Sequence, residues 1–169
     1  MRIITGDECG LLKECIPELA RSRKDDENTK VTITKNLGVE RINRNDPFTR
    51  ENGIVGLTWI QPEDDDCFAS LTVSGNLKLW KRSSSKERSF ASYQELSSVS
   101  NIFRSDEINP LTTPLGLELV DEKKKLLCSC NAAGKIVLVN PDEQSIVRSF
   151  EPLKPSTDPA LANHPILTT

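Results

Sequence analysis

Short apolar runs separated by turn residues recur along the chain, and three segments share one order of positions. In each, a run rich in apolar and small residues leads through a few small or polar residues to a glycine, and a second strand-like run follows. The three segments are RIITGDECGLLKEC (2–15), CFASLTVSGNLKLW (67–80) and LLCSCNAAGKIVLV (126–139). A two-residue hairpin turn of the primed type needs positive φ, which glycine adopts without steric cost. The pattern therefore predicts hairpins that turn at Cys9-Gly10, Ser74-Gly75 and Ala133-Gly134.

A second repeated element precedes two of these hairpins. The segments IVGLTWI (54–60) and PLGLELV (114–120) share a Gly-Leu pair, and each leads into a charged turn. Their glycines, Gly56 and Gly116, are 60 residues apart, whereas the turn glycines Gly75 and Gly134 are 59 apart. The spacing therefore recurs with a slip of one residue. Further strand-like runs follow the three hairpins, at 31–37, 88–96 and 145–153.

Four short antiparallel strands per unit are the composition of a β-propeller blade. We expect an all-β fold that forms part of a propeller, with about three blades. The expected units are about 2–37, 54–96 and 114–153, with insertions at about 21–30 and 97–113, and with 154–169 leading toward a next blade. In the run KIVLV (135–139) the four residues after Lys135 are continuously apolar, as in strands that stacked blades cover on both faces. A β-sandwich or a meander remains an alternative, because it also has short strands between turns.

The same residues resemble the WD-repeat proteins, whose units end in a Trp-Asp pair after a hairpin with a small residue and glycine. LTVSGNLKLWK (71–81) matches best, but Lys81 follows Trp80 where the repeat has Asp, and no Gly-His dipeptide occurs. The Asp-His-Ser-Trp hydrogen-bond network of regular repeats is therefore not expected, and the blades should rely on apolar packing. Trp59 and Trp80 are expected to pack within the blades.

The order of segments is similar to that of the nucleolar WD-repeat assembly factors of the large ribosomal subunit. In that family a Gly-x-x-x-Gly-x-Leu-Lys segment opens the first blade, and Gly6, Gly10, Leu12 and Lys13 match it. The resemblance implies a seven-bladed propeller, of which this chain is the N-terminal part. It also implies a non-catalytic scaffold without a cofactor, which joins large-subunit precursors in the nucleolus beside other assembly factors and precursor rRNA. An AAA-type ATPase would release it.

Two other functions remain open beside this resemblance. One is a WD-type interaction module of another nuclear or cytoplasmic complex, and the other is a propeller hydrolase with a bound metal. The single histidine, His164, and the lack of nucleophile or phosphate-binding motifs disfavour catalysis. The net charge of −3 and the pI near 5.3 argue against nucleic-acid binding through bulk charge. Local basic patches remain possible contacts.

Composition also bears on location. No segment approaches the roughly 18 consecutive apolar residues of a membrane-spanning helix, so no membrane association is expected. The five cysteines are an odd number without a recurring spacing, which fits a reducing compartment. Cys128 and Cys130 could form half of a zinc site, but zinc needs about four ligands in paired clusters, and the only histidine, His164, lies in a proline-flanked tail. The two cysteines are therefore expected to be buried in a strand. The acidic run 63–66 lacks the spaced ligands of a calcium loop and is expected to be a solvated turn.

Candidate contacts with RNA or protein lie in predicted loops. The stretch KRSSSKER (81–88) combines basic residues, which attract phosphates, with serines 83–85, which accept phosphate groups. A second basic loop tip follows two acidic residues at 121–122, and an aromatic residue in the longer insertion is expected to be an exposed anchor for a partner. The candidate residues are Lys81, Arg82, Lys86, Arg88, Phe103, Arg104, Lys123, Lys124 and Lys125.

Overall fold

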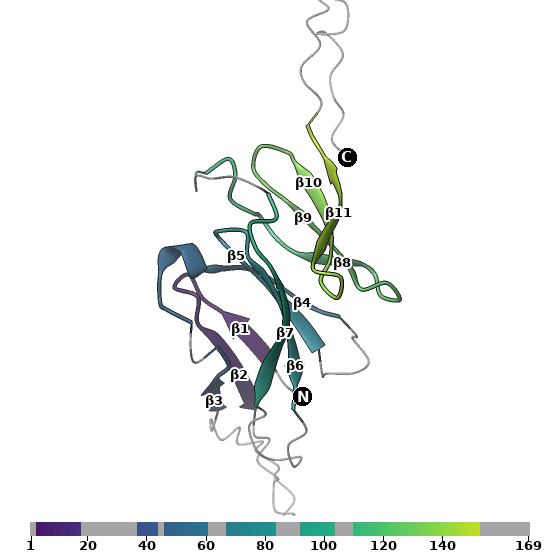
Figure 1. The fold of residues 1–169 in the computed structure, drawn as a ribbon. Coiled ribbons are helices and arrows are strands. Elements are labelled where there is room, and N and C mark those ends of the chain that lie inside the picture. Colours follow the sequence, from purple (N-terminus) through teal and green to yellow (C-terminus); the bar gives the residue numbers. More distant parts are fainter. Residues whose placement is uncertain are drawn as a thin grey trace, which may run out of the picture.

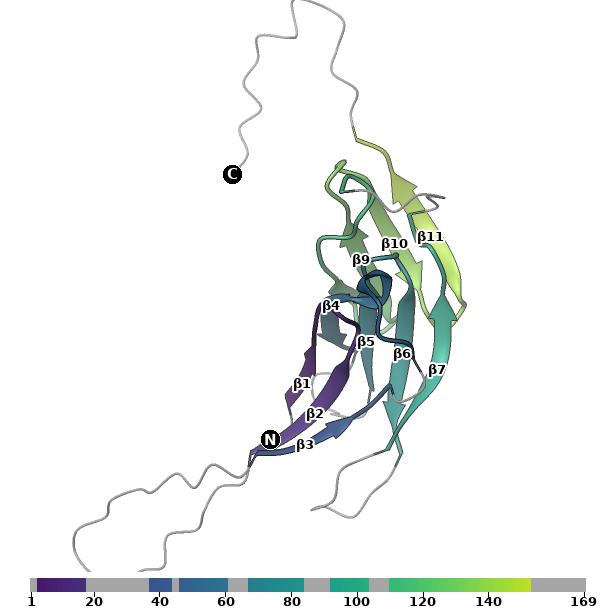
Figure 2. The ribbon, with the colours of Figure 1, turned by 90° about the vertical axis from the view of Figure 1, so that its left-hand side faces the viewer.

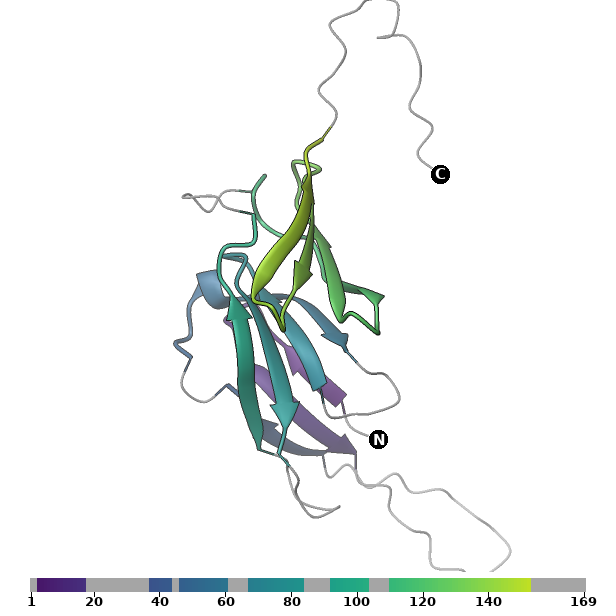
Figure 3. The ribbon, with the colours of Figure 1, turned by 45° about the vertical axis from the view of Figure 1, so that its right-hand side comes forward.

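Eleven strands form three separate antiparallel sheets in the computed structural model, which describes residues 3–17, 37–43, 46–60, 67–83, 92–103 and 110–152. The sheets, here called blades 1, 2 and 3, follow one another along the chain, and blade 2 lies between the other two (Figures 1 and 3). Within the described ranges, no helix is long and apolar enough to cross a membrane.

Each blade is a meander in which neighbouring strands are consecutive in the chain. Blade 1 contains β1 (Ile3–Gly6), β2 (Leu12–Pro17) and β3 (Leu37–Arg41). Blade 2 contains β4 (Ile54–Trp59), β5 (Cys67–Thr72), β6 (Leu77–Arg82) and β7 (Tyr93–Val99). Blade 3 contains β8 (Glu118–Asp121), β9 (Leu126–Cys130), β10 (Ile136–Asn140) and β11 (Ser145–Phe150). A short 3-10 helix, η1 (Arg50–Asn52), precedes β4.

The strand register shows that blades 2 and 3 repeat one structural unit. Trp59 of β4 lies opposite Phe68 of β5, and Leu119 of β8 lies opposite Leu127 of β9. Leu127 follows Phe68 by 59 residues, and Leu119 follows Trp59 by 60. The predicted slip of one residue between the two units is therefore confirmed, and so is the partial propeller with four-stranded blades. The strands β1, β4 and β8 contact one another in that order. Figure 2 shows the strands of blade 2 side by side in the order β4, β5, β6 and β7.

Blade 1 differs from the other two because three described strands form it. Its hairpin β1–β2 carries Gly10 and therefore corresponds to the hairpin β5–β6 of blade 2. No described strand of blade 1 fills the position that β4 and β8 fill in the other two blades. Its third strand also differs from the expected range 31–37. The strand β3 begins at Leu37, the last residue of that range, and residues 31–36 lie outside the described residues.

Apolar side chains fill the space between the blades. Between blades 2 and 3, alternate residues of β5 and β6 pack on alternate residues of β9 and β10, and all of them are at most 1% exposed. These residues are Ala69, Leu71, Leu77, Leu79, Leu127, Val137 and Val139. Burying one such Leu or Val side chain is worth about 1.5–3 kcal/mol, so packing between the blades stabilises their association. A second cluster joins blades 1 and 2 through Leu12, Ile42, Phe68 and Trp80.

The other face of blade 3 is open. Ile136 is the counterpart of Leu77 but is 39% exposed, whereas Leu77 is fully buried. A Cβ atom at Gly56 would lie 2.6 Å from the Cβ of Leu117 in blade 3, whereas at Gly116, the equivalent position, no heavy atom lies within 4 Å. The run 135–139 is therefore buried on one face only, contrary to the expectation, because no described sheet covers its second face.

The cysteine pair lies on this open face, in β9. Cys130 is exposed and Cys128 is half-buried, so the expectation of two buried thiols is wrong for the same reason. Burial raises the pKa of the Cys128 thiol, and the neighbouring Cys130 and Glu118 raise it further. All five cysteines belong to the described residues, and none of them forms a disulfide.

Candidate interaction surface at the glycine-loop end

Three hairpin loops with one backbone conformation lie at the same end of the blades. They span Asp7–Leu11, Thr72–Asn76 and Asn131–Lys135. In each loop the glycine N–H donates to the carbonyl of the first residue, and the N–H of the first residue donates to the carbonyl of the last. The three glycines have φ of 87, 77 and 82°, which confirms the predicted positive φ. The loops have three residues rather than the predicted two, because the left-handed glycine forms a bulge after the turn.

A short polar side chain at the first position stabilises each loop. The Asp7 carboxylate accepts hydrogen bonds from the backbone N–H groups of Leu11 and Cys9, at 2.9 and 3.0 Å. Thr72 and Asn131 accept in the same way from the last residue of their own loops. The bond from Leu11 lowers the pKa of Asp7; burial opposes this effect, and Cys9 and Lys13 lower the pKa further. An Asp, Thr or Asn stands three residues before each turn glycine, and this sequence signal of the loop was not among the predictions.

Hydrogen bonds from the backbone and from the Asn43 side chain fasten the connectors between the blades to these loops. The buried Asn43 donates to the carbonyl of Gly10 at 2.6 Å and accepts from the N–H of Leu12 at 2.9 Å. The same connector reaches the next blade, since Val73 N–H donates to the carbonyl of Gly53 at 2.8 Å. The connector from blade 2 to blade 3 repeats this arrangement through the pairs Ile102–Gly75 and Ala133–Leu111, both at 3.0 Å. We call these loops and connectors the glycine-loop end.

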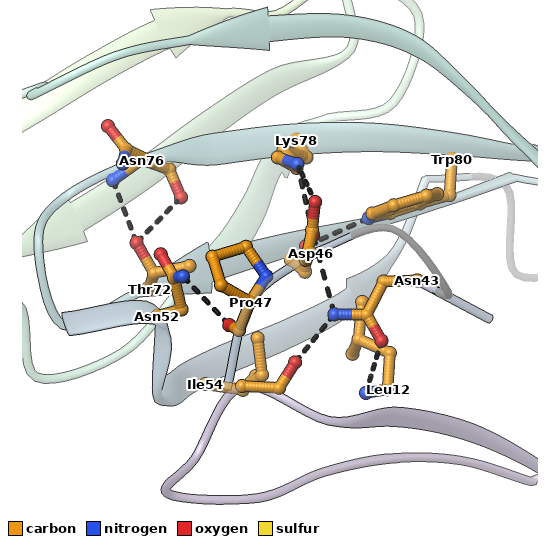
Figure 4. Close-up of a pocket in the computed structure, with 12 residues that line it drawn as sticks. Leu12, Asn43, Asp46, Pro47, Asn52, Ile54, Thr72, Asn76, Lys78 and Trp80 are labelled. Carbon is orange, nitrogen blue, oxygen red and sulfur yellow. Dashed lines mark hydrogen bonds and ion pairs between the residues drawn. The ribbon is translucent and has the colours of Figure 1, made fainter. Parts of the chain in front are cut away.

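A polar joint lies between blades 1 and 2 beneath the first connector. It surrounds a cavity of about 230 Å³ and contains the Asp46 carboxylate, which lies 3.0 Å from Lys78 Nζ (Figure 4). Lys78 Nζ also lies 3.0 Å from the Glu95 carboxylate. Burial lowers the pKa of Lys78, but the bonds to the two carboxylates raise it, and the net pKa is above its ordinary value. The side chains around the cavity bond to one another, so we assign it a structural role.

Trp80 contributes to this joint, and its Nε1–H donates to the buried Ser70 hydroxyl at 2.9 Å. A Ser-Trp bond is one contact of the Asp-His-Ser-Trp network that the WD-repeat resemblance implies for regular repeats, and the complete network was not expected here. At the same joint Tyr93 donates to the fully buried Glu14 carboxylate at 3.1 Å. Blades 1 and 2 are therefore joined by polar as well as apolar contacts, and the expectation of apolar packing alone is wrong. Trp59 packs edge-on against Phe68, as expected of a blade-packing residue.

Exposed apolar side chains project from the fastened connectors. Phe48 is 57% exposed, Leu111 61% and Leu115 63%. The guanidinium of Arg41 lies 4.0 Å from the centre of the Phe48 ring, which holds the ring in place by a cation–π contact. Apolar residues on loops that a rigid scaffold positions are typical of contacts with partners.

The predicted basic contacts lie at the opposite end of the blades. Lys81 is exposed and Arg82 is half-buried at the end of β6, and the tip between β8 and β9 holds the lysines 123–125. Lys123 and Lys124 are exposed, whereas Lys125 pairs with Asp142 at 2.8 Å. Ser83 bonds to Ser92. The candidates Lys86, Arg88 and Arg104, serines 84–85 and the acidic run 63–66 lie outside the described residues.

Phe103 is the one described candidate at the glycine-loop end, and it is 5% exposed. The expectation of an exposed aromatic anchor is therefore wrong. The preceding residue, Ile102, is fully buried and is fixed by its bond to Gly75, which brings Phe103 into the core between blades 2 and 3. No group of three His, Cys, Asp or Glu residues able to hold a metal ion occurs within the described ranges.

Neither a protein-family model nor a curated protein matches the sequence. Among solved structures, the crystal structure of the C-terminal WD40 domain of Sif2 is similar, with a TM-score of 0.52 and 10% sequence identity. The match covers 89% of this chain and 33% of that chain, so the chain spans about a third of the length of its structural neighbour. The likeness concerns the fold, which is that of an open, partial WD40 β-propeller.

Proposed function

We propose that the protein is a non-catalytic scaffold that binds partner proteins at the glycine-loop end. The observation that carries this proposal is the combination of exposed apolar residues with rigid support: Phe48, Leu111 and Leu115 project from connectors that hydrogen bonds hold against the hairpin loops. Connectors held in this way lose little backbone conformational entropy on binding, which favours affinity. A WD40-type fold supplies the support, and the loops supply the contacts.

The resemblance to the nucleolar assembly factors supports a more specific role. In this role the protein works in the nucleolus and nucleus, where it joins precursors of the large ribosomal subunit, binds other assembly factors and is released by an AAA-type ATPase. Precursor rRNA would be a local contact at the opposite end, through the exposed Lys81, Lys123 and Lys124. The acidic neighbours Glu122 and Glu143 restrict such a contact to a few phosphates.

The proposed role includes further blades. The open face of blade 3 carries apolar residues at the positions that are fully buried in blade 2, and Gly116 leaves the space that Leu117 fills beside Gly56. Apolar surface of this kind is stable in water when another sheet covers it. We therefore propose that the described blades form one part of a larger ring.

Gentle affinity purification of the protein, tagged at its own locus, tests this role. We expect precursor rRNA and large-subunit proteins to be enriched with the wild type. The double variant Leu111→Ser, Leu115→Ser should lose protein partners and keep its fold, because both side chains are more than 60% exposed. Lys123→Glu with Lys124→Glu should reduce the rRNA alone. A different stable set of partners without precursor rRNA would reject ribosome assembly, and the absence of any stable partner would reject the scaffold.

A further inference from the structure

A small apolar groove opens at the glycine-loop end between the first two hairpin loops. Its volume is about 360 Å³, at the low end of the range for ligand sites. The apolar side chains of Ile54, Val55 and Val73 line it, and Glu8, Arg50 and Glu51 stand around it. The groove is large enough for one large apolar side chain with its flanking backbone and too small for a folded element.

The walls of the groove are fixed to one another. Ile54 N–H donates to the carbonyl of Asp7 at 2.9 Å, and Ser74 N–H donates to the carbonyl of Glu51 at 3.0 Å. A Cβ atom at Gly53 would lie 2.5 Å from the carbonyl oxygen of Glu8, so glycine alone permits this close approach. The loop of blade 1, η1, the start of β4 and the loop of blade 2 therefore form one preformed site. A preformed site binds without the entropic cost of ordering its own loops.

Valine is not favoured by local sequence preferences at position 73. It occupies the second position of its hairpin loop, where the other two loops have the exposed residues Glu8 and Ala132. A β-branched apolar residue is not a turn former, and polar or small residues are favoured at such positions. Local sequence preferences that conflict with the structure are typical of functional sites. The half-buried Val73 side chain supplies one apolar wall of the groove.

Acidic side chains outnumber basic side chains around the groove. Glu8, Glu51 and Arg50 are all exposed, and no ion pair in the described part of the chain involves either carboxylate. Two carboxylates and one guanidinium leave one net negative charge beside an apolar floor. This combination favours a basic group next to an apolar one.

We propose that this groove binds an extended segment of a partner protein, which inserts one large apolar side chain beside a lysine or arginine. The apolar side chain lies on Ile54, Val55 and Val73, and the basic side chain lies near Glu8 and Glu51. The inference rests on the proposed scaffold function and specifies the chemistry of one partner segment. It concerns a segment of a few residues, because the groove accommodates one side chain.

Selection from a phage-displayed library of random 12-residue peptides on the full chain tests the inference. We expect enriched peptides with Leu, Ile, Met or Phe within two positions of Lys or Arg. Val73→Glu should weaken the binding of synthetic copies more than tenfold, since it replaces an apolar wall of the groove with a charged side chain that the bound apolar side chain would desolvate. Glu8→Lys with Glu51→Lys should weaken it about three- to tenfold, as expected for exposed charge pairs. Glu143→Lys, an exposed carboxylate at the opposite end, is the matched control and should change nothing.

Three results would overturn the inference. The first is a set of enriched peptides whose affinity is unchanged by Val73→Glu and by the double variant Glu8→Lys, Glu51→Lys. The second is a set of enriched peptides that are acidic, and the third is a selection without any enriched family. Circular dichroism tests whether Val73→Glu is folded. If it is not, the double variant Glu8→Lys, Glu51→Lys still tests the groove, because both side chains are exposed. Failure of the groove can be distinguished from failure of the proposed scaffold function. If the wild type retains partners from cells and Val73→Glu retains all of them, the groove is wrong and the scaffold stands.

Discussion

The three turn glycines offer a comparison in which local conformation is constant and only the surroundings differ. Gly10, Gly75 and Gly134 have φ between 77 and 87°, in the left-handed region that disfavours side chains. A Cβ atom at Gly75 would lie 3.5 Å from its nearest neighbour, Ile102 N, whereas at Gly10 it would lie 2.5 Å from the carbonyl oxygen of Asn52. Gly10→Ala should therefore destabilise the protein more than Gly75→Ala.

The magnitudes follow from the two terms. The left-handed conformation costs a residue with a side chain about 1–2 kcal/mol, of which a lower unfolded-state entropy offsets a part, so Gly75→Ala should cost about 1 kcal/mol. Gly10→Ala adds a clash with the backbone of η1, for which overpacking values of about 1–3 kcal/mol apply, and should cost about 2–4 kcal/mol in total. At about 2–4 °C per kcal/mol for a chain of this size, the loss in Tm is about 2–4 °C for Gly75→Ala and about 4–16 °C for Gly10→Ala.

Thermal unfolding followed by far-ultraviolet circular dichroism measures the difference, because this signal reports all three sheets. Asparagine tolerates the left-handed region, so Gly75→Asn should be nearly neutral, whereas Gly10→Asn should remain destabilised by the clash. Equal losses of Tm for Gly10→Ala and Gly75→Ala would refute the reasoning, since they would show that η1 moves away at no cost.

Two further predictions concern single side chains. Ser70→Ala removes the acceptor of a buried indole N–H and should lower the free energy of unfolding by about 1–3 kcal/mol. Ser97→Ala removes a buried hydroxyl without a partner in the described structure and should be neutral or stabilising. Urea unfolding measures both changes, and the reverse order of stability would contradict the hydrogen-bond assignment. Because the pKa of Asp7 is lower in the folded protein than its unfolded value of about 3.9, its carboxylate contributes stability above about pH 4 that is lost as the pH falls through the folded-state pKa. Asp7→Asn should therefore flatten the decline of Tm below pH 4, and an unchanged decline would show that other groups cause it.

The repeat was predictable from the sequence because it depends on local chemistry. Gly10, Gly75 and Gly134 are needed wherever the hairpin turns, and the Gly-Leu pairs at 56 and 116 keep their spacing because β4 and β8 pair with the next strand at equivalent positions, Trp59 with Phe68 and Leu119 with Leu127. The short loops and the four strands per blade follow from such local signals. The third strand of blade 1 was predicted less well, since its residues carry no comparable turn signal.

The candidate interaction surface was not predicted from the sequence. Charge is visible in the sequence, so the basic tips at Lys81 and Lys123 were proposed as contacts, but they lie at the opposite end of the blades. Phe103 was misplaced because its burial depends on the bond of Ile102 to a loop in a different part of the blade. The groove beside Val73 could not be found by motif, because its walls come from four segments that the chain brings together by packing.

The sequence by itself determined the all-β class, the blade period and the three hairpins, because glycine conformation and apolar alternation act over a few residues. The tertiary structure alone decided which face of each strand is buried, which polar side chains join the blades and which loops form the groove. The physical reason is that burial and electrostatic pairing arise between blades, whose contacting residues lie far apart in the chain. Ile136 and Leu77 occupy equivalent strand positions, and only the presence of a neighbouring sheet makes one buried and the other exposed.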